Sequence, residues 1–200
     1  ELLLVDSGAQ YADGTTDITR TIALGDPGDE ARVQYTRVLQ GMVAISRVRF
    51  PKGVSGGHID ALARYPLWLA GQDFDHGTGH GVGHFLSVHE QPQRFDRRVN
   101  EIELKPGMVT TIEPGYYKAG AYGIRIENQV EVVDDGDGFL SFRSLTLVPI
   151  DLRLADIGLL TTAERSWIDA YHRRVAQELD GLLEPETLGW LAERTAPIGA

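Results

Sequence analysis

Apolar residues dominate the first positions of the chain, and the pattern there predicts two paired strands. The run from Leu2 to Val5 predicts a buried strand that is already under way at the first residue, so we expect the chain to be part of a longer protein. Asp17 to Leu24 predicts a second strand. Asp13-Gly14 between them is a strong turn signal, so we expect a hairpin.

Apolar positions spaced three and four residues apart then predict two helices. The first helix has an apolar face that runs from Tyr35 to Ile45. The second covers Ile59 to Leu67, and we expect Pro66 to kink or end it, because proline lacks the backbone N–H that a helix interior requires.

The rest of the chain returns to strands and then to helix. Three strands are predicted at Val109–Tyr117, Tyr122–Val133 and Phe139–Pro149. Thr161 opens a capping box for a further helix, and 182–193 predicts a short last one. Strands, helices and strands joined by hairpin-like turns favour an α+β fold over alternating βαβ units.

Composition narrows the chemistry that the chain can perform. The net charge of −10 argues against a general nucleic-acid binder, and no apolar run approaches the roughly 20 residues that span a bilayer. We therefore expect neither a nucleic acid nor a membrane as partner. The chain has no cysteine, so any metal must be held by Asp, Glu and His, which suit Mn, Co, Zn or Mg.

Acidic residues stand at the ends of several predicted strands. Asp6 directly follows the first apolar run, and Asp17 opens the second strand. A tight hairpin would bring both carboxylates to one face. Taken singly, Asp6 is equally an Asp that caps a turn, and Asp17 a solvent-facing residue of an edge strand. This pair alone is weak evidence for a metal site.

A segment rich in glycine and histidine lies between the predicted helices and the later strands. His76 and His80 have the spacing of helical zinc proteases, but Gly-Thr-Gly between them is poor helix material and no Glu stands beside His76. The glycines instead favour a close approach of the backbone to a metal or substrate. An adventitious metal-binding loop is the alternative. His89 lies just beyond, and His84 is interpreted as structural or solvent-facing.

Two glutamates complete the set of candidate ligands. Glu113 ends a β-branched strand and is followed by Pro-Gly, and Glu127 lies in Gly-Ile-Arg-Ile-Glu-Asn. Arg125 shares a strand face with Glu127, so an ordinary in-strand ion pair between them is the competing interpretation. Four carboxylates brought together without cations would repel one another. Two divalent ions would neutralise them, so the residues alone predict a dinuclear metallohydrolase of unspecified substrate.

The segments DSGAQYADGTTDITRT, HGTGHGVGHFLSVHE, TIEPGYY and GIRIEN resemble those of the aminopeptidase P (Xaa-Pro aminopeptidase) family of pita-bread metallopeptidases. The resemblance runs from Val5 to about Pro149 and is closest to the long, cytosolic-like subgroup. It implies a pita-bread fold, a curved antiparallel sheet flanked by helices, that lacks its start. Residues 1–150 would form the catalytic domain and 151–200 a helical C-terminal extension. A further active-site histidine and non-catalytic N-terminal domains would lie in sequence upstream of this chain.

The resemblance also implies roles for the candidate residues. His76 and His89 resemble the outer histidines that hold substrate and shuttle protons, and Arg125 resembles the arginine that orients the site. Glu113 would be the general base. Two divalent cations are implied, most commonly Mn²⁺, with Zn²⁺ or Co²⁺ as alternatives. The implied metal ligands are Asp6, Asp17, His80, Glu113 and Glu127.

The activity that the resemblance implies is release of the residue in front of proline at a peptide N-terminus, by attack of a metal-bridging hydroxide. Peptides that begin Xaa-Pro would be the partners, and a cytoplasmic homodimer is implied. Prolidase, a dipeptidase with the same ligands, is the nearest alternative. A non-catalytic pita-bread binding protein and a creatinase-like enzyme are others, but the full ligand set argues against both.

Overall fold

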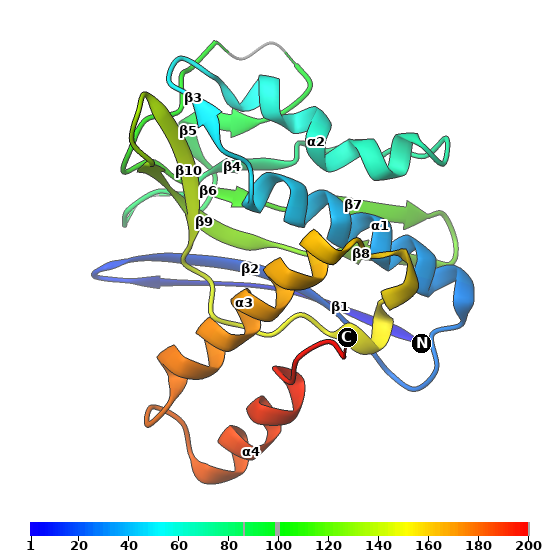
Figure 1. Ribbon diagram of the computed structural model, residues 1–200. Helices are drawn as coiled ribbons and strands as arrows, with labels where there is room; N and C mark the ends of the chain where they lie inside the picture. Colours follow the sequence, from blue (N-terminus) through cyan, green and yellow to red (C-terminus); the bar gives the residue numbers. More distant parts are fainter. Residues whose placement is uncertain (86, 99–100, 200) are drawn as a thin grey trace.

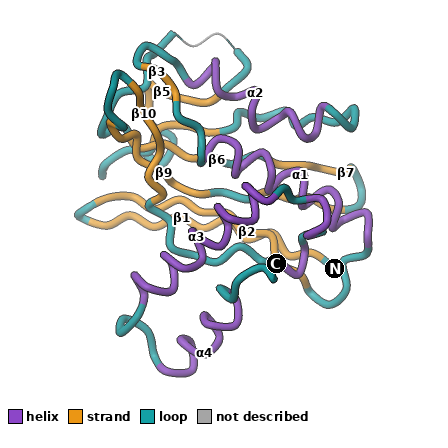
Figure 2. Tube along the Cα trace, in the orientation of Figure 1, coloured by secondary structure: helices purple, strands orange, loops and turns teal. Residues whose placement is uncertain are grey.

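The computed structural model describes residues 1–85, 87–98 and 101–199. Its main sheet is antiparallel and has the strand order β3-β10-β9-β6-β4-β5. The strands of this sheet are β3 (Phe50–Pro51), β4 (Gly79–Gly81), β5 (Glu90–Phe95), β6 (Val109–Ile112), β9 (Asn128–Asp134) and β10 (Phe139–Ser144). Two hairpins form separate two-stranded sheets beside it: β1 (Leu2–Tyr11) with β2 (Gly14–Ala23), and β7 (Gly115–Lys118) with β8 (Tyr122–Arg125). The strands form one curled layer, and the predicted α+β class is confirmed (Figure 2).

The β1–β2 hairpin forms as predicted and is longer than the pattern indicated. Asp6 lies opposite Thr19, and Asp17 lies two residues before Thr19 on the same face of β2, so both aspartates point to one side. The prediction that Leu2 to Val5 is a buried strand is wrong, because Leu3 and Val5 are 43% and 40% exposed. β1 has β2 as its strand partner and packs one face toward β8, so alternate side chains face outward.

Helices cover one face of the sheet. α1 (Asp29–Ser46) crosses the sheet between α2 (Gly56–Trp68) and α3 (Thr162–Leu179) (Figure 1). Its predicted apolar face is confirmed, since Tyr35, Val38, Met42 and Ile45 are completely buried in the core. α2 ends two residues after Pro66, as the missing N–H predicts.

Two of the predicted strands are broken at the candidate ligands. Val109–Tyr117 divides into β6 and β7 at Glu113-Pro114, and Tyr122–Val133 divides into β8 and β9 at Ile126-Glu127. At each break the glutamate N–H leaves the ladder: Glu113 donates to Thr78 O (2.7 Å), and Glu127 donates to Thr19 O (3.0 Å). The two glutamates therefore stand where the sheet opens.

The C-terminal part is helical. Two short 3₁₀ turns, Leu152–Leu154 and Ile157–Leu159, lead into α3, whose predicted capping box at Thr161 is present. α4 (Pro185–Arg194) begins later than predicted, with proline in its first turn. β10 ends at Ser144, short of the predicted Pro149. Among the described residues, no helix is long and apolar enough to cross a membrane.

Candidate metal centre

The five predicted ligands converge where the β1–β2 hairpin, β4 and the two strand breaks meet. One donor atom from each of Asp6, Asp17 and Glu127 lies within 4.8 Å of the others, and the same holds for His80, Glu113 and Glu127. Glu127 belongs to both groups, so the two groups share a carboxylate. All five line one cleft of about 420 Å³.

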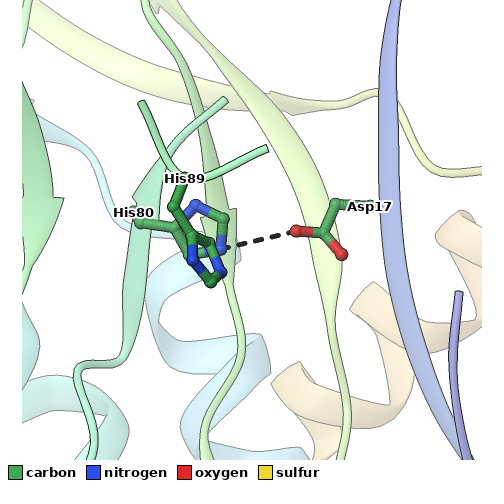
Figure 3. A group of neighbouring side chains, drawn as sticks. All are labelled: Asp17, His80 and His89. Atoms are coloured by element: carbon green, nitrogen blue, oxygen red, sulfur yellow. Dashed lines mark ion pairs between the residues drawn. The ribbon is translucent and has the colours of Figure 1, made fainter. Parts of the chain in front are cut away.

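The backbone fixes which nitrogen of His80 faces the cleft. Nδ1 lies 2.9 Å from Gly81 O, and because a carbonyl only accepts, Nδ1 carries the proton. Nε2 then points to the carboxylates. It lies 3.4 Å from Asp17 Oδ2 (Figure 3) and 3.4 Å from Glu113 Oε1. A backbone carbonyl on the second nitrogen is how proteins commonly orient a metal-binding imidazole.

Glycine allows β4 to hold this histidine inside the sheet. A Cβ at Gly79 would lie 2.0 Å from Thr111 O, so no larger residue fits there without moving a strand. The His80 N–H bonds to Thr111 Oγ1 at 3.1 Å. Gly79 therefore brings the backbone against that of a neighbouring strand, where a close approach to a metal or substrate was expected, and this contact fixes the position of the imidazole.

The electrostatics of the cleft favour added positive charge. Burial raises the pKa of Glu113 to about 7, despite the nearby His80 and Arg125. Burial, and next the charge of Glu113, raises the pKa of Glu127 to about 8. Burial disfavours a charged His80, but its hydrogen bonds with Asp17 and the Gly81 carbonyl, together with the charges of Glu113 and Asp17, outweigh this and raise the imidazole pKa. Carboxylates held this close and this dry fit a pair of divalent cations.

His89 stands against the same group. Its ring meets that of His80 edge to face, with 4.2 Å between centroids, and Asp17, His80 and His89 also have donor atoms within 4.8 Å of one another (Figure 3). His89 is exposed, in contrast to the buried Asp17. The structure thus brings this outer histidine into the cleft.

His76 and Arg125 meet through a residue that the sequence patterns missed. The hydroxyl of Tyr117 donates to His76 Nε2 (2.8 Å) and accepts from Arg125 Nη1 (3.1 Å), since His76 Nδ1 donates to Gly77 O. Burial lowers the pKa of His76, which keeps the imidazole neutral. Tyr117 follows Glu113 by four residues in an aromatic pair, and that pattern alone gives no sign of this contact.

Arg125 pairs with Asp6 and Glu113 and not with Glu127, its partner in the competing interpretation. It bonds to Asp6 Oδ2, and its Nε lies 3.7 Å from Glu113 Oε2. The in-strand ion pair with Glu127 does not form, because β8 ends at Arg125 and Glu127 lies in the break. Thr19, also missed, donates to Glu127 Oε2 (2.7 Å) and accepts from Arg125 Nε (3.2 Å). Its place two residues after Asp17 on β2 is the only sequence signal for it.

Known proteins with similar sequences identify the family. Residues 1–134 match the model of metallopeptidase family M24, and residues 138–198 match the C-terminal region of that family. The chain belongs to metallopeptidase family M24. Within M24, it is 48% identical over 208 residues to a probable Xaa-Pro aminopeptidase P of Tuber melanosporum, and 45% identical over 209 residues to the Xaa-Pro aminopeptidase app-1 of Caenorhabditis elegans.

These M24 relatives are much longer proteins. The alignments cover 98% and 99% of this chain but 34% of each relative, so the chain spans about a third of their length. An X-prolyl aminopeptidase structure from C. elegans, described as a cytosolic enzyme with a di-nuclear active site, matches with a TM-score of 0.95 and 46% identity, over 98% of this chain and 34% of that one. A prolidase from Pyrococcus furiosus matches with a TM-score of 0.64 and 37% identity, over 72% of this chain and 41% of that one.

The expected resemblance to aminopeptidase P and the pita-bread fold are both confirmed by these M24 relatives. The division at residue 150 and the roles of individual residues stay predictions. His84 is exposed and lines an adjoining groove of about 690 Å³, between the hairpin turn and residues 145–148, which shares Asp17 with the ligand cleft. It lies outside the three candidate ligand groups.

Proposed function

We propose that this chain carries the catalytic centre of a dinuclear metal-dependent aminopeptidase that releases the N-terminal residue from peptides with proline in second position. The observation that carries the proposal is the convergence of four carboxylates and one imidazole in two groups that share Glu127. Proline selectivity is supported by relatives named Xaa-Pro aminopeptidase that align with nearly the whole chain.

Two divalent cations, when bound, would supply Lewis acidity and an activated water for hydrolysis of the first peptide bond. We assign Asp6 to one cation, and His80 and Glu113 to the other. Asp17 and Glu127 would be shared between the two cations. The donor set is rich in oxygen with a single imidazole, which favours Mn²⁺ over Zn²⁺ or Co²⁺.

The remaining groups bind substrate and move protons. Glu113 is proposed as the general base, as the family resemblance implies, because its carboxylate lines the ligand cleft beside His80, 3.4 Å from its Nε2. His76 and His89 would hold the substrate beside it, in a neighbouring cleft of about 440 Å³ that both line. Arg125 would orient Asp6 and Glu113, which it contacts.

We further propose that the whole protein is a cytoplasmic homodimer that acts on Xaa-Pro peptides. The cytoplasm is supported by the C. elegans structure described as a cytosolic enzyme. The dimer rests on the family resemblance and is tested by measuring mass in solution.

The test is hydrolysis of three matched peptides, Xaa-Pro-Yaa, Xaa-Ala-Yaa and the dipeptide Xaa-Pro, by the chain with Mn²⁺ and with chelator. The same assay is run on a longer chain extended to the length of the relatives. Mn²⁺-dependent cleavage of Xaa-Pro-Yaa alone is expected. Preference for the dipeptide would favour prolidase instead, and metal binding without any hydrolysis by the longer chain would favour a non-catalytic protein.

The bridging role of Asp17 is tested by Asp17→Ala. Loss of a shared carboxylate is expected to abolish activity and the second Mn²⁺ binding event, measured by calorimetric titration. Asp26→Ala is the matched control, since Asp26 is an exposed aspartate that pairs with Arg32 at the surface. Near-normal turnover of the Asp17 variant with bound metal would overturn this assignment.

A further inference from the structure

A buried arginine behind the metal centre donates, within the part of the chain that the structure describes, to neutral oxygens. Arg20 lies on β2 and is 6% exposed. Its acceptors are Thr19 O (3.0 Å), Glu127 O, Asn128 Oδ1 (2.7 Å), Val148 O (2.7 Å), Pro149 O (3.0 Å) and Tyr171 Oη (3.0 Å). Because these acceptors come from four different parts of the chain, the guanidinium joins β2, the Glu127 break, residues 148–149 and α3.

Arg20 is part of the structure that fixes Glu127. The backbone N–H of Glu127 donates to Thr19 O, its carbonyl accepts from Arg20, and its carboxylate accepts from the Thr19 hydroxyl. Glu127 lies outside the strand ladder, so these contacts replace the ones that a sheet would supply. A shift of Arg20 would therefore move the carboxylate that both ligand groups share.

The hydroxyl of Tyr171 connects this arginine to the C-terminal helix α3. It accepts from Arg20 Nη2 and donates to Val148 O (2.8 Å). The tyrosine is 5% exposed, and its ring stacks on Trp167 with 5.4 Å between centroids and 5° between planes. The ring is fixed by packing, so the hydroxyl has one position in which to meet the guanidinium.

A second connection reaches Asp17 from the same segment. Thr146 O lies 3.3 Å from the Tyr171 hydroxyl, and Thr146 Oγ1 accepts from the Gln129 N–H (2.8 Å). The side-chain oxygen of Gln129 then accepts from the Asp17 N–H (3.2 Å). Glu127 thus rests on Arg20, which Tyr171 contacts directly, and Asp17 rests on Gln129, which Tyr171 reaches through Thr146.

We infer that Tyr171, on a C-terminal helix that supplies none of the candidate ligands, is a positioning residue for the metal centre, acting through Arg20 on Glu127 and through Thr146 and Gln129 on Asp17. The inference rests on the proposed function, since it concerns how tightly the two cations are held. Changes to residues that orient metal ligands typically weaken metal binding about 10- to 100-fold. We expect Tyr171→Phe, which removes one oxygen and keeps the stacked ring, to fall near the lower end.

The test is Mn²⁺ titration of the chain, followed by the electron paramagnetic resonance signal of free Mn²⁺. Tyr171→Phe is expected to weaken at least one of two binding events about tenfold. Arg20→Lys, which keeps the charge and loses the planar fork, is expected to weaken it further. The control is Val175→Ala on the same helix, a fully buried apolar residue one turn along. Val175→Ala is expected to lower the melting temperature of the metal-free chain and to leave the affinities for both Mn²⁺ ions unchanged. All titrations are run well below the melting temperatures of the variants.

Each outcome decides a different claim. A selective loss of affinity in Tyr171→Phe and Arg20→Lys supports the inference. Affinities of Tyr171→Phe equal to those of the unaltered chain, or an equal loss in Val175→Ala, would overturn it and leave the proposed function standing. An unaltered chain that does not bind two Mn²⁺ would overturn the proposed function, and the inference with it.

Discussion

Replacing Glu127 by glutamine should stabilise the metal-free protein, although it removes a proposed ligand. Glu127 is 1% exposed and sits beside other carboxylates. Burial and the charge of Glu113 raise its pKa from the ordinary 4.5 to about 8. Glutamine has nearly the same shape and can still accept the hydrogen bond of Thr19, so the change removes the charge and leaves that contact.

The size of the effect follows from the two pKa values. Below pH 4.5 the carboxyl is protonated in the folded and unfolded states, and its ionisation costs nothing. As the pH rises from 4.5 to 8, the unfolded chain releases the proton that the folded chain retains, so the stability of the unaltered protein falls by about 1.4 kcal/mol per pH unit. At pH 7 the glutamine variant should therefore be more stable by about 3 kcal/mol.

The assay is urea denaturation in the presence of a chelator at pH 5, 6, 7 and 8. The advantage of Glu127→Gln should be small at pH 5 and grow with pH. Glu131→Gln on β9 is the control: this glutamate pairs with Arg143 near the surface and should change stability by less than about 1 kcal/mol. A Glu127→Gln variant that is less stable than the unaltered chain at pH 7 without metal would refute the reasoning.

Mn²⁺ should reverse the order of the two proteins. A ligand present at one hundred times its dissociation constant stabilises the folded state by about 2.7 kcal/mol. The unaltered chain should gain this stabilisation from each of its two proposed cations, about 5 kcal/mol in all, which exceeds the advantage of about 3 kcal/mol that the variant has without metal. The variant, which lacks a shared carboxylate, should gain little of it. A residue that destabilises the protein without the ligand and stabilises it with the ligand is typical of a binding centre.

Two further predictions concern packing and acid stability. Gly79→Ala should destabilise the fold by about 1–3 kcal/mol and weaken metal binding, because its Cβ would lie 2.0 Å from Thr111 O. The control Gly189→Ala, which has open space around it in α4, should stabilise the fold by about 0.5–1 kcal/mol. Thermal denaturation and metal titration compare the two variants. Burial lowers the pKa of His172 to about 4 from 6.5, so the unfolded chain takes up a proton that the folded chain refuses, and about 3 kcal/mol should be lost as the pH falls from 6.5 to 4. His172→Gln, which can still accept from the Ile150 N–H, should lose less over that range in urea denaturation, and a loss as large as that of the unaltered chain would contradict the assignment.

The sequence predicted the elements whose patterns are long and regular. The face of α1 and the β1–β2 turn follow from residue spacing alone, and the candidate ligands could be named because acidic groups beside apolar strands are unusual. The break at Ile126-Glu127 was not predicted, because Ile124 to Val130 reads as continuous β-sequence, whereas the Pro-Gly after Glu113 does indicate the end of a strand. A break depends on where each N–H finds an acceptor, and Thr78 and Thr19 are distant in sequence.

The same limit applies to the residues around the ligands. Tyr117, Thr19 and Arg20 act through contacts that span the fold, and nothing adjacent to them in sequence indicates their partners. The exposure of Leu3 and Val5 shows the opposite error. Their apolar character predicted burial, but the side on which a strand is covered depends on what packs against it.

The placement of ligands at breaks in the sheet also determines when the centre can form. Glu127 is held by Thr19, Asp17 by Gln129, and Arg125 by Asp6, across separations of 108, 112 and 119 residues. Contacts of such long range close late in folding, because chain entropy must be lost before they form. Residues 1–120 of this sequence include four of the five donors but lack Glu127 and Gln129. The metal centre is therefore a product of long-range contacts, and metal uptake reports that residues 6–19 have met residues 125–129.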